Sequence, residues 1–262
     1  MSLLRNALRA LPAYLWSGWG AVASLLLMLA GWEWASLLYG ELILPDPRAT
    51  AQTLARLLSN GDALPELATT ARRALAGLGA ALVLGSTFGI AAGISMTASM
   101  MSRPIMTVLI GTPPIAWLVL AMLWFGAGDG TPVFTVFIAC LPVVFVGAMQ
   151  GARTLDSQLT DMATAYRLPL AMRVLDVHLP HIVSYLFPAW ITALGISWKV
   201  VVMAELLASS DGVGAALAVS RSHLDTASTL AWIGAVVGLL LAVEYLLFEP
   251  LKREIERWRP QS

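Results

Sequence analysis

Three stretches of the sequence, each about 20 residues long, contain no charged side chain; they cover residues 75–96, 105–126 and 132–151. A helix rises about 1.5 Å per residue, so about 20 apolar residues cross a bilayer core of about 30 Å. In the whole chain 58% of the residues are hydrophobic and 12% are charged, against roughly 45–50% and 25% in a soluble domain. The sequence therefore predicts an all-α polytopic membrane protein.

Six stretches are apolar enough to cross a bilayer, and we predict one transmembrane domain over residues 1–262. The spans lie near residues 15–39, 75–97, 105–126, 132–152, 182–208 and 230–249. The first follows Arg5 and Arg9, as the apolar core of a secretory signal peptide would. Its low-charge region covers residues 11–39, well beyond the roughly 7–15 residues of a signal core. We therefore predict that it is a retained first helix.

The basic residues predict the orientation of these spans, because positively charged loops stay in the cytoplasm. With the N-terminus inside, six crossings return the C-terminus to the cytoplasm. This arrangement places most of the sixteen basic residues inside, namely Arg5, Arg9, Arg103, Arg153, Arg167, Arg173, Lys252, Arg253, Arg257 and Arg259. The outer side then holds Arg48, Arg56, Arg72, Arg73 and Arg221. Both termini and the long loop over residues 153–182 are therefore predicted to be cytoplasmic.

The segment between the first two spans, residues 46–73, mixes charged residues with leucines at helical spacing. The pattern is interrupted at Asn60, Gly61 and Pro65, which are residues that end or break helices. We expect separate helices here that lie along the outer membrane surface.

Small residues recur every four positions in the second span, at Gly77, Ala81, Gly85, Gly89 and Gly93. Such ladders let two helix backbones approach closely. The neighbouring helix belongs either to the same subunit or to a second copy, and the pattern does not decide between these two interpretations.

Several short motifs occur in a distinctive order along residues 44–250. They are Leu44-Pro45, Arg73 with Gly77, Pro113-Pro114-Ile115-Ala116-Trp117 with Leu123-Trp124-Phe125-Gly126, and Gly195-Ile196-Ser197-Trp198 with Ala204-Glu205-Leu206 and Gly212-Val213-Gly214. In this order and spacing the sequence resembles the permeases of binding-protein-dependent importers. Within that family it is most similar to the nitrate, sulfonate, taurine and bicarbonate branch.

The hallmark of this family is a cytoplasmic signature that begins with Glu-Ala-Ala, continues with a glycine and ends in Ile-x-Leu-Pro. Alignment on Leu179-Pro180 places Asp161, Met162 and Ala163 at Glu-Ala-Ala, Arg167 at the glycine and Val177 at the isoleucine. Met162 and Arg167 depart from the pattern. Arg167 stands where a glycine would permit a tight turn.

The resemblance implies a coupling helix at about residues 162–172 that docks into a groove on a separate ATPase. The residues carried over to this role are Asp161, Met162, Ala163, Arg167, Leu168, Pro169, Leu179 and Pro180. The loop is amphipathic, and Pro169 is compatible with a first helical turn. The alternative interpretation is a solvated connector.

The resemblance further implies a type I ABC importer permease fold in a bacterial inner membrane. Its partners would be a second permease copy, two ATP-binding cassette ATPase subunits and a soluble solute-binding protein. The sequence contains no Gly-x4-Gly-Lys-Ser/Thr phosphate-binding loop. We therefore expect ATP and Mg²⁺ to bind to the ATPase, and this chain to bind no cofactor and to be no enzyme.

Lys199 lies within the fifth predicted span, where a charge costs on the order of 2.5–3.5 kcal/mol. Trp198 and Glu205 are seven residues apart and share a helix face. We assign Trp117, Trp198, Lys199 and Glu205 to the path of a small, anionic solute. The alternatives are a structural ion pair for Lys199, an interfacial carboxylate for Glu205 and simple packing for Trp198.

Other classes of protein are less compatible with the sequence. Lys199 and Glu205 could be the titrating pair of an ion-coupled secondary transporter, but the internal repeats common in such proteins are not apparent. A membrane-embedded enzyme should show clustered intramembrane acids or histidines. A metal site is not expected, because Pro180 interrupts the helix between His178 and His181 and no cysteine is nearby. The formal net charge of zero also argues against a nucleic-acid partner.

Overall fold

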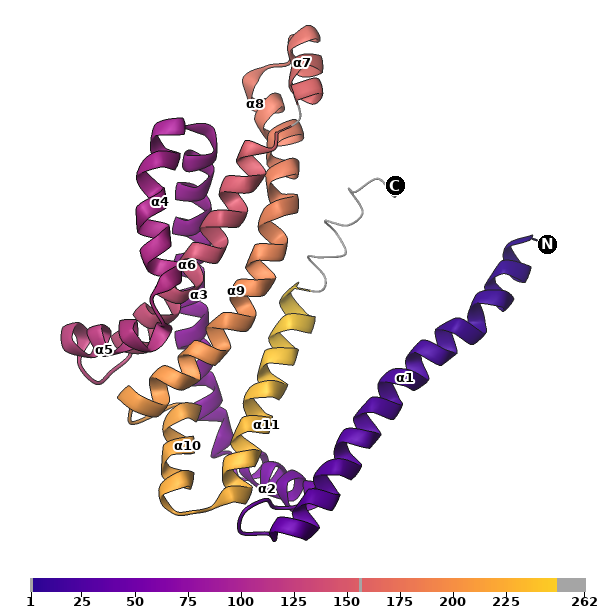
Figure 1. Ribbon diagram of the computed structural model, residues 1–262, viewed down its shortest axis with the longest axis vertical. Coiled ribbons are helices and arrows are strands. Elements are labelled where there is room, and N and C mark those ends of the chain that lie inside the picture. The colour runs from indigo at the N-terminus through magenta and orange to yellow at the C-terminus, as the bar shows by residue number, and fades with distance from the viewer. Residues whose placement is uncertain (1, 156, 249–262) are drawn as a thin grey trace.

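The computed structural model of the chain describes residues 2–155 and 157–248 (Figure 1). Every regular element in these ranges is helical, which confirms the all-α class. The elements are α1 (Ser2–Tyr39), α2 (Pro47–Ser59), α3 (Ala63–Ile94), α4 (Met96–Gly111), α5 (Pro114–Phe125), α6 (Gly130–Arg153), α7 (Ser157–Ala165), α8 (Leu170–Met172), η1 (Arg173–His178), α9 (Leu179–Ala208), α10 (Val213–Ser222), α11 (Thr226–Val243) and η2 (Glu244–Phe248). The predicted end of the last span at residue 249 and the basic residues Lys252, Arg253, Arg257 and Arg259 lie outside the described residues.

Five helical stretches of the described chain are long and apolar enough to cross a bilayer. They are Val22–Tyr39, Ala63–Ile94, Gly130–Arg153, Arg173–Ala208 and Thr226–Leu246. The pair α4 and α5 passes the same test and makes a sixth span if it is counted as one. The chain is therefore polytopic, as predicted.

The third span differs from a single helix over residues 105–126, because α4 and α5 meet at an angle of 97°. Thr112 and Pro113 have extended backbone between the two helices. Each precedes a proline, whose ring disfavours helical conformation in the residue before it. Helix α5 begins again with Pro114 in its first turn, where the missing N–H is not needed. In Figure 1, α5 lies across the lower end of α4.

The segment over residues 46–73, which was predicted to lie on the outer side, forms one short helix and the start of a long one. Asp46 caps α2 by accepting a hydrogen bond from the Ala49 amide, and α2 ends before Gly61, whose φ is +82°. Pro65 does not interrupt a helix, because it lies in the first turn of α3. The expectation of a separate surface helix after Pro65 is therefore wrong, since residues 63–73 belong to α3.

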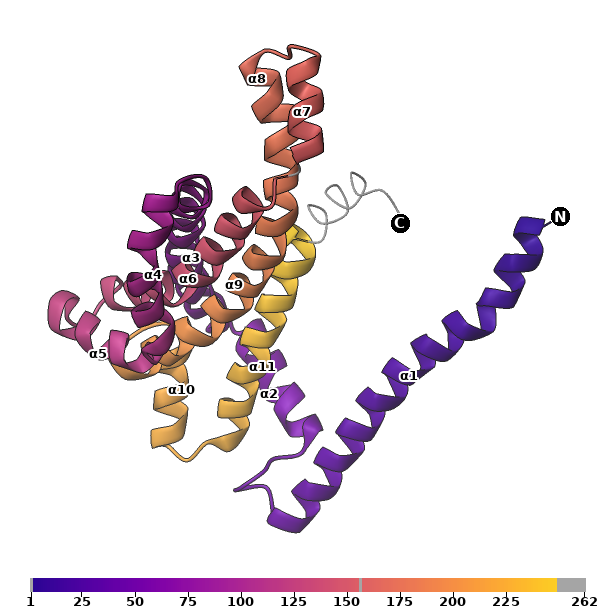
Figure 2. The same ribbon diagram turned by 45° about the horizontal axis from the view of Figure 1, so that its top comes forward.

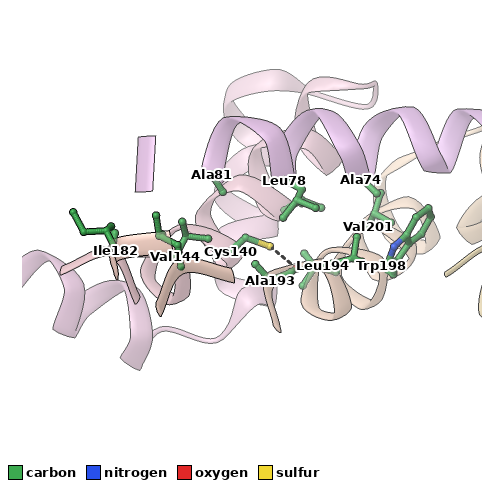
Figure 3. Close-up of a cluster of buried hydrophobic side chains, with 14 of the residues drawn as sticks. Ala74, Leu78, Ala81, Cys140, Val144, Ile182, Ala193, Leu194, Trp198 and Val201 are labelled. Atoms are coloured by element: carbon green, nitrogen blue, oxygen red, sulfur yellow. Dashed lines mark hydrogen bonds between the residues drawn. The ribbon is translucent and has the colours of Figure 1, made fainter. Parts of the chain in front are cut away.

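The core of the subunit lies where α3, α6 and α9 pack together. Its buried side chains include Leu78, Val144, Leu194 and Val201, which converge in Figure 3. The thiol of Cys140 is buried among them and donates a hydrogen bond to the carbonyl oxygen of Ala193 at 3.3 Å. Cys140 is therefore a packing residue.

The glycine ladder of α3 faces α6 within the same subunit. Gly77, Gly85, Gly89 and Gly93 lie against Val136, Val144, Ala148 and Ala152, respectively. A Cβ atom added to Gly89 would lie 2.5 Å from the carbonyl oxygen of Phe145. The glycine ladder could have faced a helix of the same subunit or of a second copy. The structure shows that it packs against a helix of the same subunit.

Helix α1 lies apart from the other long helices in both views (Figures 1 and 2). Its lower end is held near α2, where the indole N–H of Trp32 donates a hydrogen bond to the carbonyl oxygen of Pro45 at 2.9 Å. Large apolar side chains are exposed along its span, including Leu25, Leu27 and Trp34. This helix therefore leaves most of its apolar surface to lipid or to another chain.

Candidate functional site

The predicted coupling loop projects from one end of the bundle (Figure 1). It consists of α7, a turn, α8 and the π-helical segment η1, which leads directly into α9. The expectation of one helix over residues 162–172 is wrong, because α7 ends at Ala165 and α8 begins only at Leu170. Pro169 contributes to this break, since it disfavours helical backbone at Leu168.

Arg167 makes the turn between α7 and α8 in the left-handed conformation, with φ of +50°. The Leu168 amide donates to the Ala163 carbonyl oxygen, and the Arg167 amide donates to that of Thr164, each at 3.0 Å. These two bonds form a Schellman motif, in which glycine usually occupies the left-handed position. Arg167 therefore makes the tight turn that the family signature assigns to a glycine. Its left-handed backbone conformation costs about 1–2 kcal/mol.

The residues carried over to the coupling role are mostly exposed on this projection. Asp161, Met162, Arg167, Pro169, Leu179 and Pro180 are exposed, Leu168 is half-buried, and Ala163 is buried beneath the turn. Neighbouring apolar side chains are exposed as well, namely Tyr166, Met172, Val174 and Leu175. An exposed apolar surface of this kind is typical of a protein contact.

A second cluster of functional groups surrounds Arg73, whose side chain is 2% exposed. Its guanidinium contacts the carboxylates of Glu205 at 3.0 Å, Asp211 at 2.6 Å and Asp129 at 2.6 Å. These groups come from α3, α9, the α9–α10 connection and the residue before α6. One buried arginine therefore joins four parts of the chain at the end of the bundle opposite α7 and α8 (Figure 1).

The carboxylate of Glu205 is fully buried and completes this cluster. Besides Arg73, it accepts hydrogen bonds from the Thr70 hydroxyl at 2.8 Å and the Gly214 amide at 3.1 Å. The Val213 amide donates to the Thr70 hydroxyl oxygen at 2.9 Å, and the Gly212 amide donates to Glu66. The first amides of α10, which have no partner inside a helix, are thus capped by α3 and α9.

Asp129 connects the buried part of the cluster to the surface. Hydrogen bonds from Arg72 and Arg73 hold the pKa of its carboxyl group below the ordinary value. A lowered pKa in the folded state means that the carboxylate stabilises the fold at neutral pH. This contribution is lost as the pH falls through the lowered pKa.

The shared face of Trp198 and Glu205 is buried inside the subunit. Trp198 is 1% exposed in the core, and Glu205 is enclosed by the Arg73 cluster. From the sequence, Arg73 was identified as a motif residue on the outer side and was assigned no role in a site. One signal for the Arg73 cluster was available in the sequence. The positively charged Arg73 and the negatively charged Glu205 were both expected near the same side of the membrane.

Lys199 points away from this core and is exposed. Among the residues that the structure describes, no acidic side chain forms an ion pair with it. Trp117, on α5, is half-buried. Of the four residues assigned to the path, these two retain surface within the chain that another molecule can contact.

The chain matches the model of the family described as "Binding-protein-dependent transport system inner membrane component" over residues 63–258. This range covers most of the chain and includes the α7–α8 projection, the Arg73 cluster and Lys199. The chain therefore belongs to this family of inner membrane transport components. It is a multi-pass permease subunit of an ABC importer and not an enzyme, as predicted, and its family works with an ATPase and a solute-binding protein.

Individual relatives have the same role. The taurine transport system permease protein TauC of Escherichia coli is 27% identical, over 88% of this chain and 86% of TauC. The putative aliphatic sulfonates transport permease protein SsuC of Bacillus subtilis is 28% identical, over 83% and 78%. The nitrate import permease protein NrtB of Leptolyngbya laminosa is 28% identical, over 67% and 64%. The predicted family branch is confirmed.

Proposed function

We propose that this permease transports a small oxyanion or sulfonate across the membrane. We further propose that ATPase subunits bind the α7–α8 projection and drive this transport. The names of the relatives support the solute class, since they refer to taurine, aliphatic sulfonates and nitrate. Each of these solutes carries a negatively charged oxyanion group. ATP and Mg²⁺ belong to the partner ATPase in this scheme.

The observation that carries the proposal is the exposed projection with its ordered turn. The Schellman motif fixes the direction in which α8 leaves α7. Met162, in the last turn of α7, and Tyr166, directly after it, are both exposed. Because η1 continues into α9, a displacement of the projection acts directly on a membrane-spanning helix. Asp161, Ala163, Leu168, Pro169, Leu179 and Pro180 complete the proposed contact.

The orientation follows from this role. The projection lies in the cytoplasm, and the Arg73 cluster with α2 and α10 lies on the opposite side, where a solute-binding protein would dock. Basic residues support this assignment, because Arg153, Arg167 and Arg173 lie at or beside the projection. Both termini are then cytoplasmic.

We further propose that two copies of the chain work as a pair with two ATPase subunits. Helix α1 supports this arrangement, because it lies apart from the other long helices and exposes large apolar side chains. The solute crosses between the copies in this scheme, near surfaces that are exposed in the single chain, and Lys199 lies on such a surface.

Arg167→Pro tests the coupling turn. Proline removes the Arg167 N–H that bonds to Thr164 and fixes φ near −65°, so the left-handed turn cannot form. We expect solute uptake and solute-stimulated ATP hydrolysis by the reconstituted complex to fall at least about tenfold, a change of about 1.4 kcal/mol.

Arg167→Gly is the matched variant, because glycine adopts positive φ without strain and keeps the turn. We expect it to retain uptake, and a purified complex should still contain the ATPase. If Arg167→Pro transports as well as Arg167→Gly, the turn is not the coupling element.

Lys199→Met tests the proposed contact with an anion. Removing the positive charge leaves an anion in a low-dielectric path without its partner, so we expect uptake of the transported anion to fall about tenfold, the loss of one charged hydrogen bond. Lys199→Arg should retain most of the uptake, which is measured with radiolabelled taurine, an alkanesulfonate and nitrate in cells.

Thr192→Met provides the control, because Thr192 is exposed on α9 seven residues earlier and thus on the same face. It introduces the same side chain without removing a charge. Equal uptake by Lys199→Met and Thr192→Met would remove Lys199 from the path.

A further inference from the structure

A pocket of about 310 Å³ lies between α2 and the start of α11, and none of its lining residues belongs to the α7–α8 projection or to the Arg73 cluster. Its lining residues are Thr53, Arg56, Leu57, Asn60, Asp225, Ala227 and Ser228. Thus the last turns of α2 form one wall and the first turn of α11 forms the other. The wall residues are mostly polar, with Leu57 as the one large apolar side chain.

The pocket holds two opposite charges that do not contact each other. Arg56 and Asp225 both line it, yet they are absent from the ion pairs of the described residues. The Arg56 guanidinium donates to the Thr53 hydroxyl at 3.1 Å within its own helix. Asp225 caps α11 by accepting from the Ser228 amide at 2.9 Å and the Ser228 hydroxyl at 2.6 Å.

The Asp225 carboxylate is stabilised in its charged form by its neighbours. The two hydrogen bonds from Ser228 hold the pKa of Asp225 below its ordinary value, and the positive charge of Arg56 adds to this effect. A simple anion in the pocket would therefore be repelled by Asp225, and a simple cation by Arg56. A molecule with a negative group and a positive group a few ångströms apart satisfies both charges at once.

The length of the adjoining span indicates that the pocket lies at the depth of the lipid headgroups. The span Thr226–Leu246 has 21 residues, and at about 1.5 Å per residue it matches the bilayer core of about 30 Å. Asp225 directly precedes this span, so it lies where hydrocarbon gives way to headgroups. Leu57 faces the same pocket and offers an apolar contact beside the two charges.

We propose that this pocket binds the headgroup of a zwitterionic phospholipid with a primary ammonium group, with its phosphate at Arg56 and Asn60 and its ammonium at Asp225. A primary ammonium donates three hydrogen bonds, whereas a quaternary ammonium donates none. Phosphatidylethanolamine has this chemistry, and a soluble amino-sulfonate such as taurine shares it. The bound lipid would add a polar bridge between α2 and α11, which already pack together, on the membrane side that the proposed orientation makes the outer one.

The test measures lipid retention by the purified chain with native mass spectrometry in detergent. Equal concentrations of phosphatidylethanolamine, phosphatidylcholine and phosphatidylglycerol with matched acyl chains are added, and soluble taurine and phosphoethanolamine form separate arms. We expect phosphatidylethanolamine to be retained about tenfold better than the other two lipids, the effect of about one charged hydrogen bond. Retention of a soluble zwitterion at least as strong as that of the lipid would overturn the lipid as the occupant.

Arg56→Gln should abolish the preference for phosphatidylethanolamine. Arg48→Gln is the matched control, because Arg48 is exposed in the first turn of the same helix but does not line the pocket. Asn60→Ala provides a second variant that removes no charge and should weaken retention to a smaller extent. Equal retention of the three lipids by the wild-type chain, or an unchanged preference in Arg56→Gln, would overturn the proposal.

Discussion

Arg73→Met should nearly abolish the folded permease in the membrane. The substitution leaves the fully buried carboxylate of Glu205 without its positive partner, and it also releases Asp129 and Asp211. Removing one partner of a buried ion pair costs about 3–5 kcal/mol, a large part of the roughly 5–15 kcal/mol that stabilises a typical folded domain. The measurement is the amount of protein in membranes together with the unfolding temperature of the purified chain.

Arg72→Met is the matched control at the neighbouring position. The Arg72 side chain is 62% exposed and contacts Asp129 at 2.6 Å, and such surface pairs contribute about 0–1 kcal/mol. We expect this variant to resemble the wild type. Equal unfolding temperatures for Arg73→Met and Arg72→Met would show that the buried cluster does not hold the outer end together.

A double variant separates the loss of charge from the loss of packing. Glu205→Gln removes the uncompensated charge, while its side-chain amide can still accept hydrogen bonds from Thr70 and Gly214. The Arg73→Met, Glu205→Gln chain should therefore be more stable than Arg73→Met alone. If the double variant is no more stable than Arg73→Met, the loss of stability comes from packing around Arg73 and not from the unpaired charge.

Gly89→Leu should have the second large effect, on the seam between α3 and α6. A Cβ atom at this position would lie 2.5 Å from the Phe145 carbonyl oxygen and 2.6 Å from the Ala148 Cβ atom. Overpacking a core typically costs about 1–3 kcal/mol, and here the backbone of α6 would have to move. We expect a clear fall in the unfolding temperature and loss of uptake.

Gly79→Leu is the matched control in the same helix. A Cβ atom at Gly79 would have no neighbouring atom within 4 Å, so the larger side chain enters open space. We expect this variant to insert, unfold and transport like the wild type. If both leucine variants are equally stable, α3 and α6 are not closely packed at Gly89.

The Arg73 cluster links segments that lie far apart in the sequence. Arg73 lies 132 residues before Glu205 in the sequence, and the first amides of α10 are capped by side chains from two other helices. Helix α9 begins where η1 ends and carries Glu205 in its last turn, so one continuous helix connects the α7–α8 projection with the Arg73 cluster.

Several features could be predicted from local sequence. The uncharged apolar stretches predict membrane helices because the free energy of transfer into hydrocarbon depends on composition. The four-residue glycine spacing of α3 predicts a close helix contact, and motif order along residues 44–250 indicates the importer permease family. Signature residues Leu179-Pro180 located the projection, although they did not predict its division into α7 and α8.

Other features depended on which segments meet in space. Burial of Trp198 and Glu205 follows from the neighbours that α3 and α10 provide, so a shared helix face did not show whether it faces solute or core. Arg167 adopts a glycine-like conformation because hydrogen bonds to Ala163 and Thr164 offset its strain. The membrane class, the helical composition and the family can be read from the amino-acid sequence, because they depend on local composition and motif spacing. The partners of Arg73 required the folded structure, because an ion pair depends on the distance between side chains far apart in the chain.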